Sequence, residues 1–230
     1  MTSAVLAGST GRVGSHILTT LLALPSISAV FAYTRRDLAH LTSHKLTPLQ
    51  SLSPTDWPSL FPTSPPPQLF LSGLGTSKAA AGSFENQYKI DHDLNLALAT
   101  AAKHAGADTY VLISAVGASA TSRFAYNRMK GELEEAVKAL GFEHTVIVRP
   151  GLIVGQRESA GAAEVVLRSV ANGLGKVWNG LKDPWAQDSV VIARAAVAAG
   201  LACVEGKREA GVWVVGMGEI VRLGRVEWRE

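Results

Sequence analysis

The sequence predicts an α/β protein built on a doubly wound parallel sheet, with a short irregular C-terminal region that covers the substrate. Two observations support this fold class. Short apolar runs, typical of strands, alternate with helical patterns through the first two-thirds of the chain, and a glycine-rich turn joins the first strand to the first helix. Strands that alternate with helices form parallel sheets with right-handed crossovers. The 230 residues are expected to form a single domain.

Apolar runs bounded by turn residues mark the expected strands, which are Ser3–Ala7, Ile27–Tyr33, Lys45–Leu49 (the weakest pattern), Gln68–Leu71, Tyr110–Ser114 and Glu143–Val148. Helical patterns between them predict helices at Gly11–Leu24, Gln87–His104 and Phe124–Leu140. The first helix stops at Pro25, and the other two end at Gly106 and Gly141. The order is therefore one of strands joined by helical crossovers.

Two regions depart from this alternation. The segment Ser51–Pro67 holds most of the ten prolines and is expected to be an irregular surface connection, neither a helix nor a good strand. After Pro150 the pattern is less regular, with expected helices at Ala162–Ala171 and Asp188–Val204 and a strand at Val212–Val215. In an open parallel sheet such a tail would cover the carboxyl ends of the strands and shape a substrate pocket.

Composition narrows the function classes. The chain is 47% hydrophobic and 18% charged, as in a globular protein, and its longest apolar runs, such as Ala195–Val204, are too short to cross a bilayer. The first strand begins close to Met1, so we expect no secretory signal or transit peptide.

Cys203 is the one cysteine, which excludes an internal disulfide. The pair His40 and His44 has no third ligand nearby, so no metal site is expected. Basic residues are not interleaved with aromatic ones, so no nucleic-acid partner is expected.

The most informative motif is the turn Gly8-Ser9-Thr10-Gly11-Arg12-Val13-Gly14, between the first expected strand and helix. Gly8 allows a sharp turn, Gly11 lets the backbone approach phosphates, and Gly14 lets the helix pack close to the strand. The helix N-terminus then offers free N–H groups to an anion. We therefore expect this turn to bind the pyrophosphate of a dinucleotide. Residues 1–150 would form the cofactor-binding core, and 151–230 would complete the same domain around the substrate. A tight turn without a ligand is the alternative.

The end of the second expected strand bears on which dinucleotide binds. Folds that bind NAD usually carry an Asp or Glu about 20 residues past the glycines, which bonds the ribose 2′-hydroxyl. Here no carboxylate occurs before Asp37, and the strand runs into Thr34, Arg35 and Arg36. Two guanidinium groups suit a 2′-phosphate by charge and geometry, and Arg12 could reach the same phosphate. The sequence thus favours NADP(H) over NAD(H). The alternative is a solvated arginine pair at the start of a loop.

Three residues are candidates for catalysis. Tyr126 and Lys130 are four apart on an expected helix, hence on one face, and Ser114 ends the preceding strand at the sheet edge that faces the ligand crevice. A nearby ammonium favours the phenolate, so Lys130 is expected to lower the pKa of Tyr126 toward the working range and to bond the ribose hydroxyls. Tyr126 would donate a proton to a carbonyl oxygen as hydride reaches its carbon, while Ser114 orients that carbonyl and stabilises its charge. The alternative is an ordinary helix with one buried tyrosine and one solvated lysine.

Together these motifs resemble the short-chain dehydrogenase/reductase superfamily, on the glycine turn, Ser114, Tyr126, Lys130 and the segment Arg149-Pro150-Gly151. Within it, the chain is similar to the atypical branch that contains the Tat-interacting-protein oxidoreductase and the fungal found-in-mitochondrial-proteome proteins. This closer likeness extends over almost the whole chain. It is carried by the segments Gly8–Gly11, Thr34–Arg36, Leu74–Thr76, Leu112–Gly117 and Tyr126–Glu132.

The resemblance implies a Rossmann-like fold, NADPH as the cofactor and a reductase-type site. It implies that Pro150 and Gly151 lie along the nicotinamide. It also implies that Leu74, Gly75 and Thr76, which could equally form an ordinary turn, approach the adenosine and ribose. For the fungal members it further implies peripheral attachment to the mitochondrial outer membrane on its cytosolic face. The residues themselves indicate no such attachment, and without it a cytoplasmic protein is expected.

Two further expectations come from the family. Asp91, assigned to the cofactor site, stands where many relatives carry an Asn. An ionised carboxylate cannot donate a hydrogen bond, which argues against a proton relay there; a solvated acid in a first helical turn is the alternative. In many relatives two long helices pair across a dimer, a role that Leu94, Leu98, Leu133 and Val137 could serve unless they face the sheet. A homodimer is therefore a candidate assembly.

The sequence thus predicts an NADP(H)-dependent oxidoreductase of the short-chain type, which reduces a small-molecule carbonyl or oxidises an alcohol. The competing interpretation is an NADPH-binding regulatory or scaffold protein with little or no turnover, peripherally attached to mitochondria. A module that only contacts membranes finds less support, because no basic amphipathic helix is evident.

Overall fold

The computed structural model describes residues 1–38, 42–154 and 185–229, which contain a seven-stranded parallel sheet. The strands are β1 (Thr2–Ala7), β2 (Ile27–Thr34), β3 (Leu46–Gln50), β4 (Leu69–Ser72), β5 (Thr109–Ile113), β6 (His144–Val148) and β9 (Gly211–Val215), in the spatial order β3-β2-β1-β4-β5-β6-β9. The order reverses between β1 and β4, the place where open parallel sheets form a ligand crevice. The predicted doubly wound α/β fold is confirmed.

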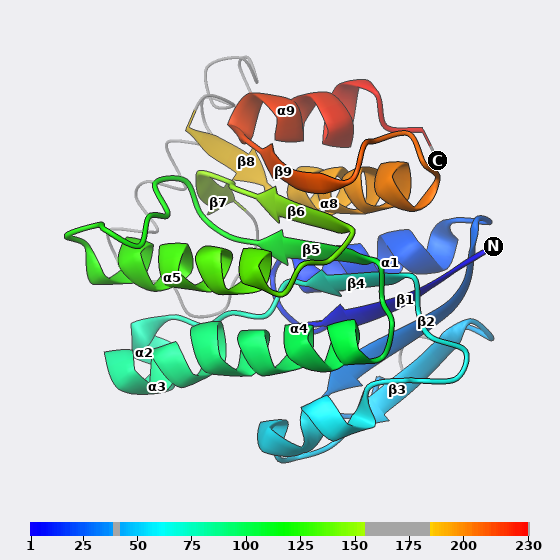
Figure 1. Ribbon diagram of the computed structural model, residues 1–230, viewed down its shortest axis with the longest axis horizontal. Helices are drawn as coiled ribbons and strands as arrows, with labels where there is room; N and C mark the ends of the chain where they lie inside the picture. The colour runs from blue at the N-terminus through cyan, green and yellow to red at the C-terminus, as the bar shows by residue number, and fades with distance from the viewer. Residues whose placement is uncertain (39–41, 155–184, 230) are drawn as a thin grey trace.

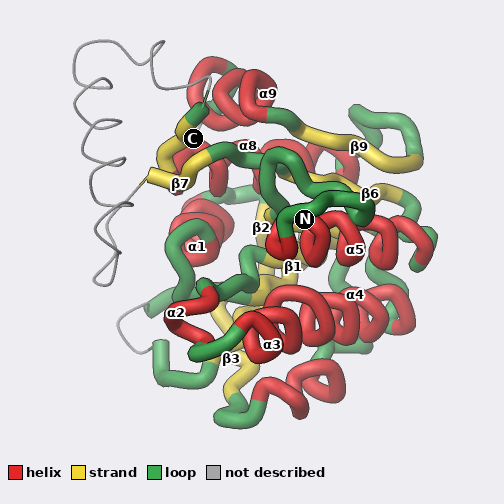
Figure 2. The backbone as a smooth tube through the Cα atoms, turned by 90° about the vertical axis from the view of Figure 1, so that its left-hand side faces the viewer, coloured by secondary structure: helices red, strands yellow, loops and turns green. Residues whose placement is uncertain are grey.

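Helices cover both faces of this sheet (Figures 1 and 2). One face packs on α1 (Gly14–Ala23) and α8 (Ser189–Val204), and the other on α4 (Asn95–His104) and α5 (Ala125–Ala139). Within β1, Ala4 and Leu6 belong to the first core, and Val5 and Ala7 to the second. Successive side chains of a strand point to opposite faces, so a strand buried on both faces reads as an unbroken apolar run. This is why these strands are recognisable in the sequence.

Several short elements were not predicted. A 3-10 helix, η1 (Pro54–Leu60), interrupts the proline-rich segment, so the expectation that this segment contains no helix is wrong. Pro54 lies in its first turn, where a missing N–H costs nothing, and its Trp57 is buried against Tyr33 with ring centroids 5.3 Å apart. Before β5, α2 (Lys78–Ala81) was not predicted. The helix expected over Gln87–His104 is present; it begins three residues earlier, as α3 (Phe84–Tyr88), and continues through a π-helical turn, η2 (Lys89–Leu94), into α4.

The C-terminal part adds a second sheet beside the first. Strands β7 (Leu152–Val154) and β8 (Ala186–Asp188) pair in parallel, and neither was predicted. Beyond β9 come α9 (Met217–Val221) and η3 (Arg222–Val226). The expected helix Ala162–Ala171 lies outside the described residues. Within the described chain, no helix has the length and apolar character that crossing a membrane requires.

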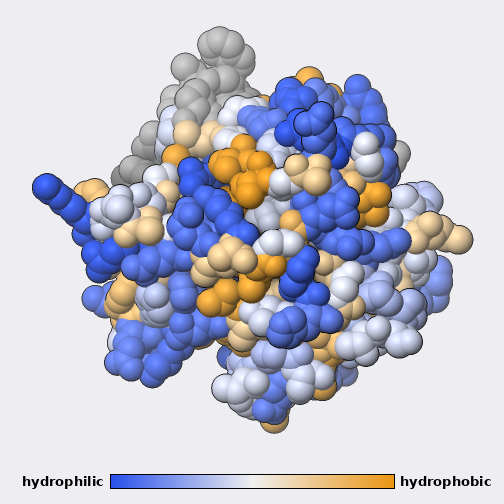
Figure 3. Space-filling model, in the orientation of Figure 1, coloured by the Kyte–Doolittle hydropathy of each residue, from blue (hydrophilic) through white to orange (hydrophobic). Residues whose placement is uncertain are grey.

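The edge strand β9 leaves apolar side chains in contact with solvent. Its Trp213 and Val215 pack into the core beneath α8, so Val212 and Val214 point to the opposite face, where they are 52% and 41% exposed. Figure 3 shows hydrophobic residues among polar ones on this side of the molecule. The family-derived dimer residues behave differently: Leu98, Leu133 and Val137 are fully buried against the sheet, and the homodimer stays a prediction.

Candidate active site

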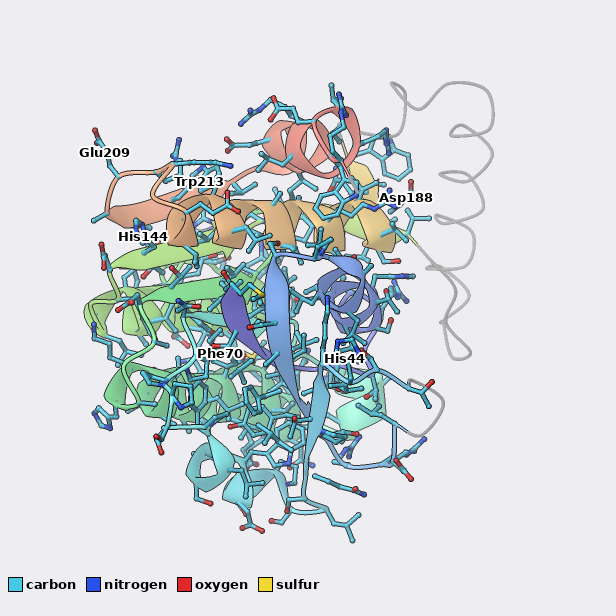
Figure 4. The ribbon with its side chains drawn as sticks, turned by 90° about the vertical axis from the view of Figure 1, so that its right-hand side faces the viewer. His44, Phe70, His144, Asp188, Glu209 and Trp213 are labelled. Atoms are coloured by element: carbon cyan, nitrogen blue, oxygen red, sulfur yellow. The ribbon has the colours of Figure 1, made fainter. Side chains whose placement is uncertain are left out.

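A cavity of about 920 Å³ opens at the carboxyl ends of the central strands. Its lining combines the glycine turn, the loop after β4 and the first turns of α5 and α8. The predicted residues among its walls are Thr10, Gly11, Arg12, Val13, Leu74, Gly75, Thr76, Asp91, Ser114, Tyr126 and Lys130. In Figure 4, Asp188, which also lines this cavity, lies at the opposite end of the molecule from His144 and Trp213. The structure thus brings most of the predicted residues to one place.

The glycine turn is as tight as its sequence suggests. Gly8 has a φ of +80°, a conformation that favours glycine, and its carbonyl accepts a 2.9 Å hydrogen bond from the Gly11 N–H. A Cβ on Gly14 would lie 2.0 Å from that carbonyl oxygen, so only glycine lets α1 start this close to the strand. Ser9 is buried and donates a 2.7 Å hydrogen bond to the carbonyl of Tyr33, which joins the turn to β2. Ser9 therefore supports the turn and does not line the cavity.

The arginines of the proposed phosphate site take two different positions. Arg12 donates a 2.8 Å hydrogen bond to the carbonyl of Ile153 in β7. β7 follows β6 in the chain, and in the sheet β6 lies on the other side of β1 from β2. Arg35 and Arg36 follow β2 directly and are exposed. Thr34 holds their backbone in a turn, because its hydroxyl accepts from the Arg36 N–H at 3.1 Å and donates to the Arg36 carbonyl at 2.5 Å. In this arrangement Arg12 contacts β7, and the two other arginines remain together outside the cavity lining.

A buried polar cluster fixes the loop after β4. Asp91, in η2, accepts a 2.6 Å hydrogen bond from the Thr76 N–H. The side-chain amide of Gln87 donates a 3.0 Å hydrogen bond to the Thr76 carbonyl. Asn95 donates to the carbonyls of Leu74 and Asp91 and accepts from the Ser72 hydroxyl. Asp91 and Asn95 are both buried, which rules out the solvated acid offered as an alternative for Asp91. Sequence reasoning missed Asn95, although its position four residues after Asp91 places both on one helical face.

The phenol and the ammonium differ from the expected arrangement. The Lys130 Nζ lies 3.7 Å from Asp91 Oδ2, and both side chains are buried. Burial raises the pKa of Asp91 and lowers the pKa of Lys130, and in each case the partner's charge opposes the shift. Tyr126 lines the cavity and is 41% exposed; desolvation of its hydroxyl and the charge of Asp91 raise its pKa to about 12. The expected lowering of the Tyr126 pKa is therefore wrong for this structure, because desolvation of the hydroxyl, and then the charge of Asp91, raise that pKa.

The hydroxyl of Ser114 is also engaged. It donates to Glu134, a fully buried carboxylate on α5 that Arg149 clamps through Nε and Nη2. The hydrogen bond to Glu134 raises the pKa of Arg149 above its ordinary value, so the guanidinium stays charged. Glu134 and Arg149 were not among the predicted site residues. The sequence does carry a signal for Glu134, since Tyr126, Lys130 and Glu134 are spaced four apart and so form one stripe on a helix.

The segment assigned to the nicotinamide by resemblance joins β6 to β7. The Pro150 carbonyl accepts a 2.8 Å hydrogen bond from the Val116 N–H. The Gly151 N–H donates a 2.8 Å hydrogen bond to Gln187 Oε1. A Cβ on Gly151 would lie 2.4 Å from the Trp185 carbonyl oxygen, so the chain passes close to the start of β8. Neither Pro150 nor Gly151 lines the cavity, and their role toward a cofactor stays a prediction.

Comparison with known proteins adds three findings. Residues 39–178 match the HIM1 family. "Protein fmp52, mitochondrial" from Emericella nidulans is 52% identical, over 98% of this chain and 100% of that protein. "Protein fmp-52, mitochondrial" from Neurospora crassa is 46% identical, over 100% of this chain and 98% of that protein.

Solved structures with the same fold are more distant in sequence. A UDP-Glc/GlcNAc 4-epimerase from Campylobacter jejuni has a TM-score of 0.69 at 14% identity, over 96% of this chain and 82% of that chain. MoeE5, solved with UDP-glucose and NAD, has a TM-score of 0.66 at 15% identity, over 95% of this chain and 79% of that chain. A short chain dehydrogenase family protein from Francisella tularensis has a TM-score of 0.65 at 12% identity, over 95% of this chain and 98% of that chain. These likenesses identify the fold as Rossmann-like.

Proposed function

Because the chain belongs to the HIM1 family and to the fungal fmp52 proteins, which carry the description mitochondrial, we propose that it is an NADP(H)-dependent oxidoreductase of the short-chain type. Its substrate would be a small carbonyl compound or the corresponding alcohol. One observation carries the proposal: a single cavity is lined by the glycine turn, the loop Leu74–Thr76 and the three side chains of Ser114, Tyr126 and Lys130. Phosphate binding and proton transfer can therefore occur in one place.

The residues present fit a dinucleotide. The closely packed glycine turn leads into the N-terminus of α1, whose free N–H groups and dipole suit a pyrophosphate. MoeE5, which shares the fold, was solved with NAD. Preference for the phosphorylated form is proposed from Arg35 and Arg36, which stand where a carboxylate would otherwise select NAD. When bound, NADPH would supply the hydride that the reduction needs.

The chain's own residues would supply the proton. Tyr126 is a phenol at neutral pH, since an ordinary tyrosine ionises only near pH 10 and burial raises the pKa of Tyr126 to about 12, so its O–H can donate to a carbonyl oxygen in the cavity. As hydride reaches the carbonyl carbon, the O–H bond of Tyr126 breaks and the substrate oxygen takes the proton, leaving an alcohol and a phenolate that solvent reprotonates. The buried pair of Lys130 and Asp91 provides a polar wall beside this phenol. Ser114 contributes its oxygen to the same wall.

A second candidate is favoured by the same geometry. The hydroxyl of Ser114 is hydrogen-bonded to Glu134 and the Tyr126 phenol is a weaker acid than usual, so proton donation by either group is less favourable than the sequence predicted. A protein that binds NADPH and signals its level to a partner, without turnover, would need only the cofactor half of the cavity. As for location, the names of the relatives support a mitochondrial protein, and we propose peripheral attachment to the cytosolic face of the outer membrane.

Binding and turnover measurements separate these candidates. Purified protein would be titrated with NADPH and NADH, then assayed with NADPH against a panel of aldehydes and ketones. Tyr126→Phe should lower turnover by about 100-fold or more while NADPH binding is kept. Tyr88→Phe is a matched control, because the Tyr88 hydroxyl donates to Glu132 and does not line the cavity. NADPH binding without turnover on any substrate supports the regulatory candidate, and tighter binding of NADH than of NADPH contradicts the proposed preference.

A further inference from the structure

The carboxylate of Asp91 is shared between two parts of the cavity wall. Its Oδ1 accepts from the Thr76 N–H at 2.6 Å, and its Oδ2 lies 3.7 Å from the Lys130 ammonium. Both Asp91 and Lys130 are buried, so water screens their charges weakly. One carboxylate therefore connects the loop after β4 to the lysine that stands one helical turn from Tyr126.

The neighbouring charges do not replace Asp91 in this role. On α5, Glu134 is the other buried acid near Lys130, but it is clamped by Arg149 and accepts from Ser114. Arg128 and Glu132 lie on the outer side of α5, 3.9 Å apart, and Tyr88 of α3 donates to Glu132. Across the cavity are the charged or titratable side chains of Arg12, His16 and Asp188. Among the described residues, Asp91 is thus the acid placed against Lys130 on the cavity side.

We propose that Asp91 is a positioning residue that balances the charge of Lys130 and so raises the pH at which the Tyr126 phenol ionises. The phenolate, which oxidation of an alcohol needs as a base, would then form only at high pH, so the site would favour reduction of a carbonyl at neutral pH. The inference about direction rests on the proposed oxidoreductase function. The inference about the proton on Tyr126 does not, because it concerns only the protein's own groups.

The expected effect has a definite sign. A negative charge beside Tyr126 and Lys130 favours the protonated form of both, so its removal must make the couple lose a proton at lower pH. The direction agrees with the charge of Asp91 being one cause of the raised pKa of Tyr126. An unbalanced ammonium next to a phenol then favours the phenolate. Replacing Asp91 by a neutral residue should shift the ionisation of Tyr126 down by about 1 to 3 pH units.

The proton on Tyr126 can be followed directly by NMR. The chain has four tyrosines, so protein labelled with 13C at the tyrosine Cζ gives four signals, and Tyr126→Phe identifies the relevant one. The titration would compare wild type, Asp91→Asn and Asp91→Ser, up to the pH at which the fold is lost. Two neutral substitutions are used because either one alone could disturb folding. Asp93→Asn is the matched control, since Asp93 is an exposed acid in the same turn and does not line the cavity.

Three results support the proposal together: Tyr126 of the wild type ionises above an ordinary phenol, both Asp91 variants ionise at lower pH, and Asp93→Asn matches the wild type. The proposal is overturned if the wild-type signal titrates at or below the value of an ordinary phenol, or if neither folded Asp91 variant shifts it. The measurement needs no substrate and no cofactor. A protein without turnover can therefore pass this test, and an active enzyme can fail it, which keeps this inference separable from the proposed function.

Discussion

The hydroxyl of Ser114 donates a 2.5 Å hydrogen bond to Oε1 of Glu134, although Ser114 also lines the cavity. A serine hydroxyl has one proton and two lone pairs. Because its O–H is donated to Glu134, Ser114 faces the cavity as a hydrogen-bond acceptor. The expected role of Ser114, donation to a developing oxyanion, would first require this bond to break. Glu134 thus controls what Ser114 can offer to a bound molecule.

We expect Glu134→Gln to destabilise the protein. The substitution keeps the size of the side chain and an acceptor for Ser114, but it leaves Arg149, 31% exposed, without its counter-charge. Breaking a buried ion pair by removing one partner costs about 3 kcal/mol at the lower end of the usual range, and the partial exposure of Arg149 places this pair there. Urea unfolding followed by circular dichroism measures the change. Glu135→Gln, at the next position and paired only on the surface with Lys138, should leave the unfolding midpoint nearly unchanged. Equal stability of the two variants would contradict the structural role of Glu134.

Gly14→Ala should prevent the glycine turn from forming. The added Cβ would stand 2.0 Å from the Gly8 carbonyl oxygen, a backbone atom that cannot move without displacing β1 from α1. We expect a loss of about 3 kcal/mol or more in the free energy of unfolding, together with loss of NADPH binding in whatever fraction stays folded. Gly218→Ala provides the comparison, because nothing lies within 4 Å of a Cβ at that position. Retention of both properties in Gly14→Ala would show that the turn is not packed as described.

Replacing both Arg35 and Arg36 by Ala should reduce the preference for the phosphorylated cofactor. Each charge-assisted hydrogen bond to a phosphate contributes about 1.5 to 3 kcal/mol, so NADPH affinity should fall by at least about tenfold while NADH affinity changes little. Isothermal titration calorimetry with both dinucleotides measures this, and the NADPH affinity of the wild type should weaken with added salt. Arg208→Ala, which removes an arginine that stacks on Trp213 at the far end of the sheet, is the control. An equal loss of affinity for NADPH and NADH would mean that the two arginines support dinucleotide binding in general and do not distinguish the phosphorylated form.

The buried tyrosines predict a loss of stability in alkali. Burial raises the pKa of Tyr33 above its ordinary value, while in the unfolded chain the same phenol ionises near pH 10. Above about pH 10 the unfolded state therefore releases a proton that the folded state keeps, so the free energy of unfolding falls as pH rises, by about 1.4 kcal/mol per pH unit for each such group. Below that pH the contribution is complete and constant. Chemical unfolding at a series of pH values measures the slope.

Tyr33→Phe should make that slope shallower. The Tyr33 hydroxyl has no hydrogen-bond partner among the described residues, so its removal should cost little at neutral pH. Its ring would still stack on Trp57. Tyr88→Phe, at a tyrosine bonded to Glu132 and less buried, should leave more of the slope in place. An alkaline slope identical to that of wild type in Tyr33→Phe would mean that other groups cause it.

Much of the fold follows from local patterns. Strands such as β1 and β5 are buried on both faces, so their apolar runs are continuous and their positions were predicted to within a few residues. The glycine turn was predicted because the spacing of its glycines reflects two local requirements: a sharp turn at Gly8 and close packing of the start of α1 at Gly14. By contrast, β7 and β8 are only three residues long and pair across a long stretch of sequence. No local sequence pattern therefore predicts them.

Many of the residues that line the cavity were predicted from the sequence, but their electrostatics were not. The sequence by itself determined the fold class, the glycine turn and the placing of Tyr126 and Lys130 on one helical face, because each depends on the periodicity of neighbouring residues. Only the tertiary structure decided that Asp91 lies beside Lys130 and that Glu134 accepts the hydrogen bond of the Ser114 hydroxyl. Proton affinities depend on charges a few ångströms away in space, and in this chain those charges come from segments that the sheet brings together from distant parts of the sequence.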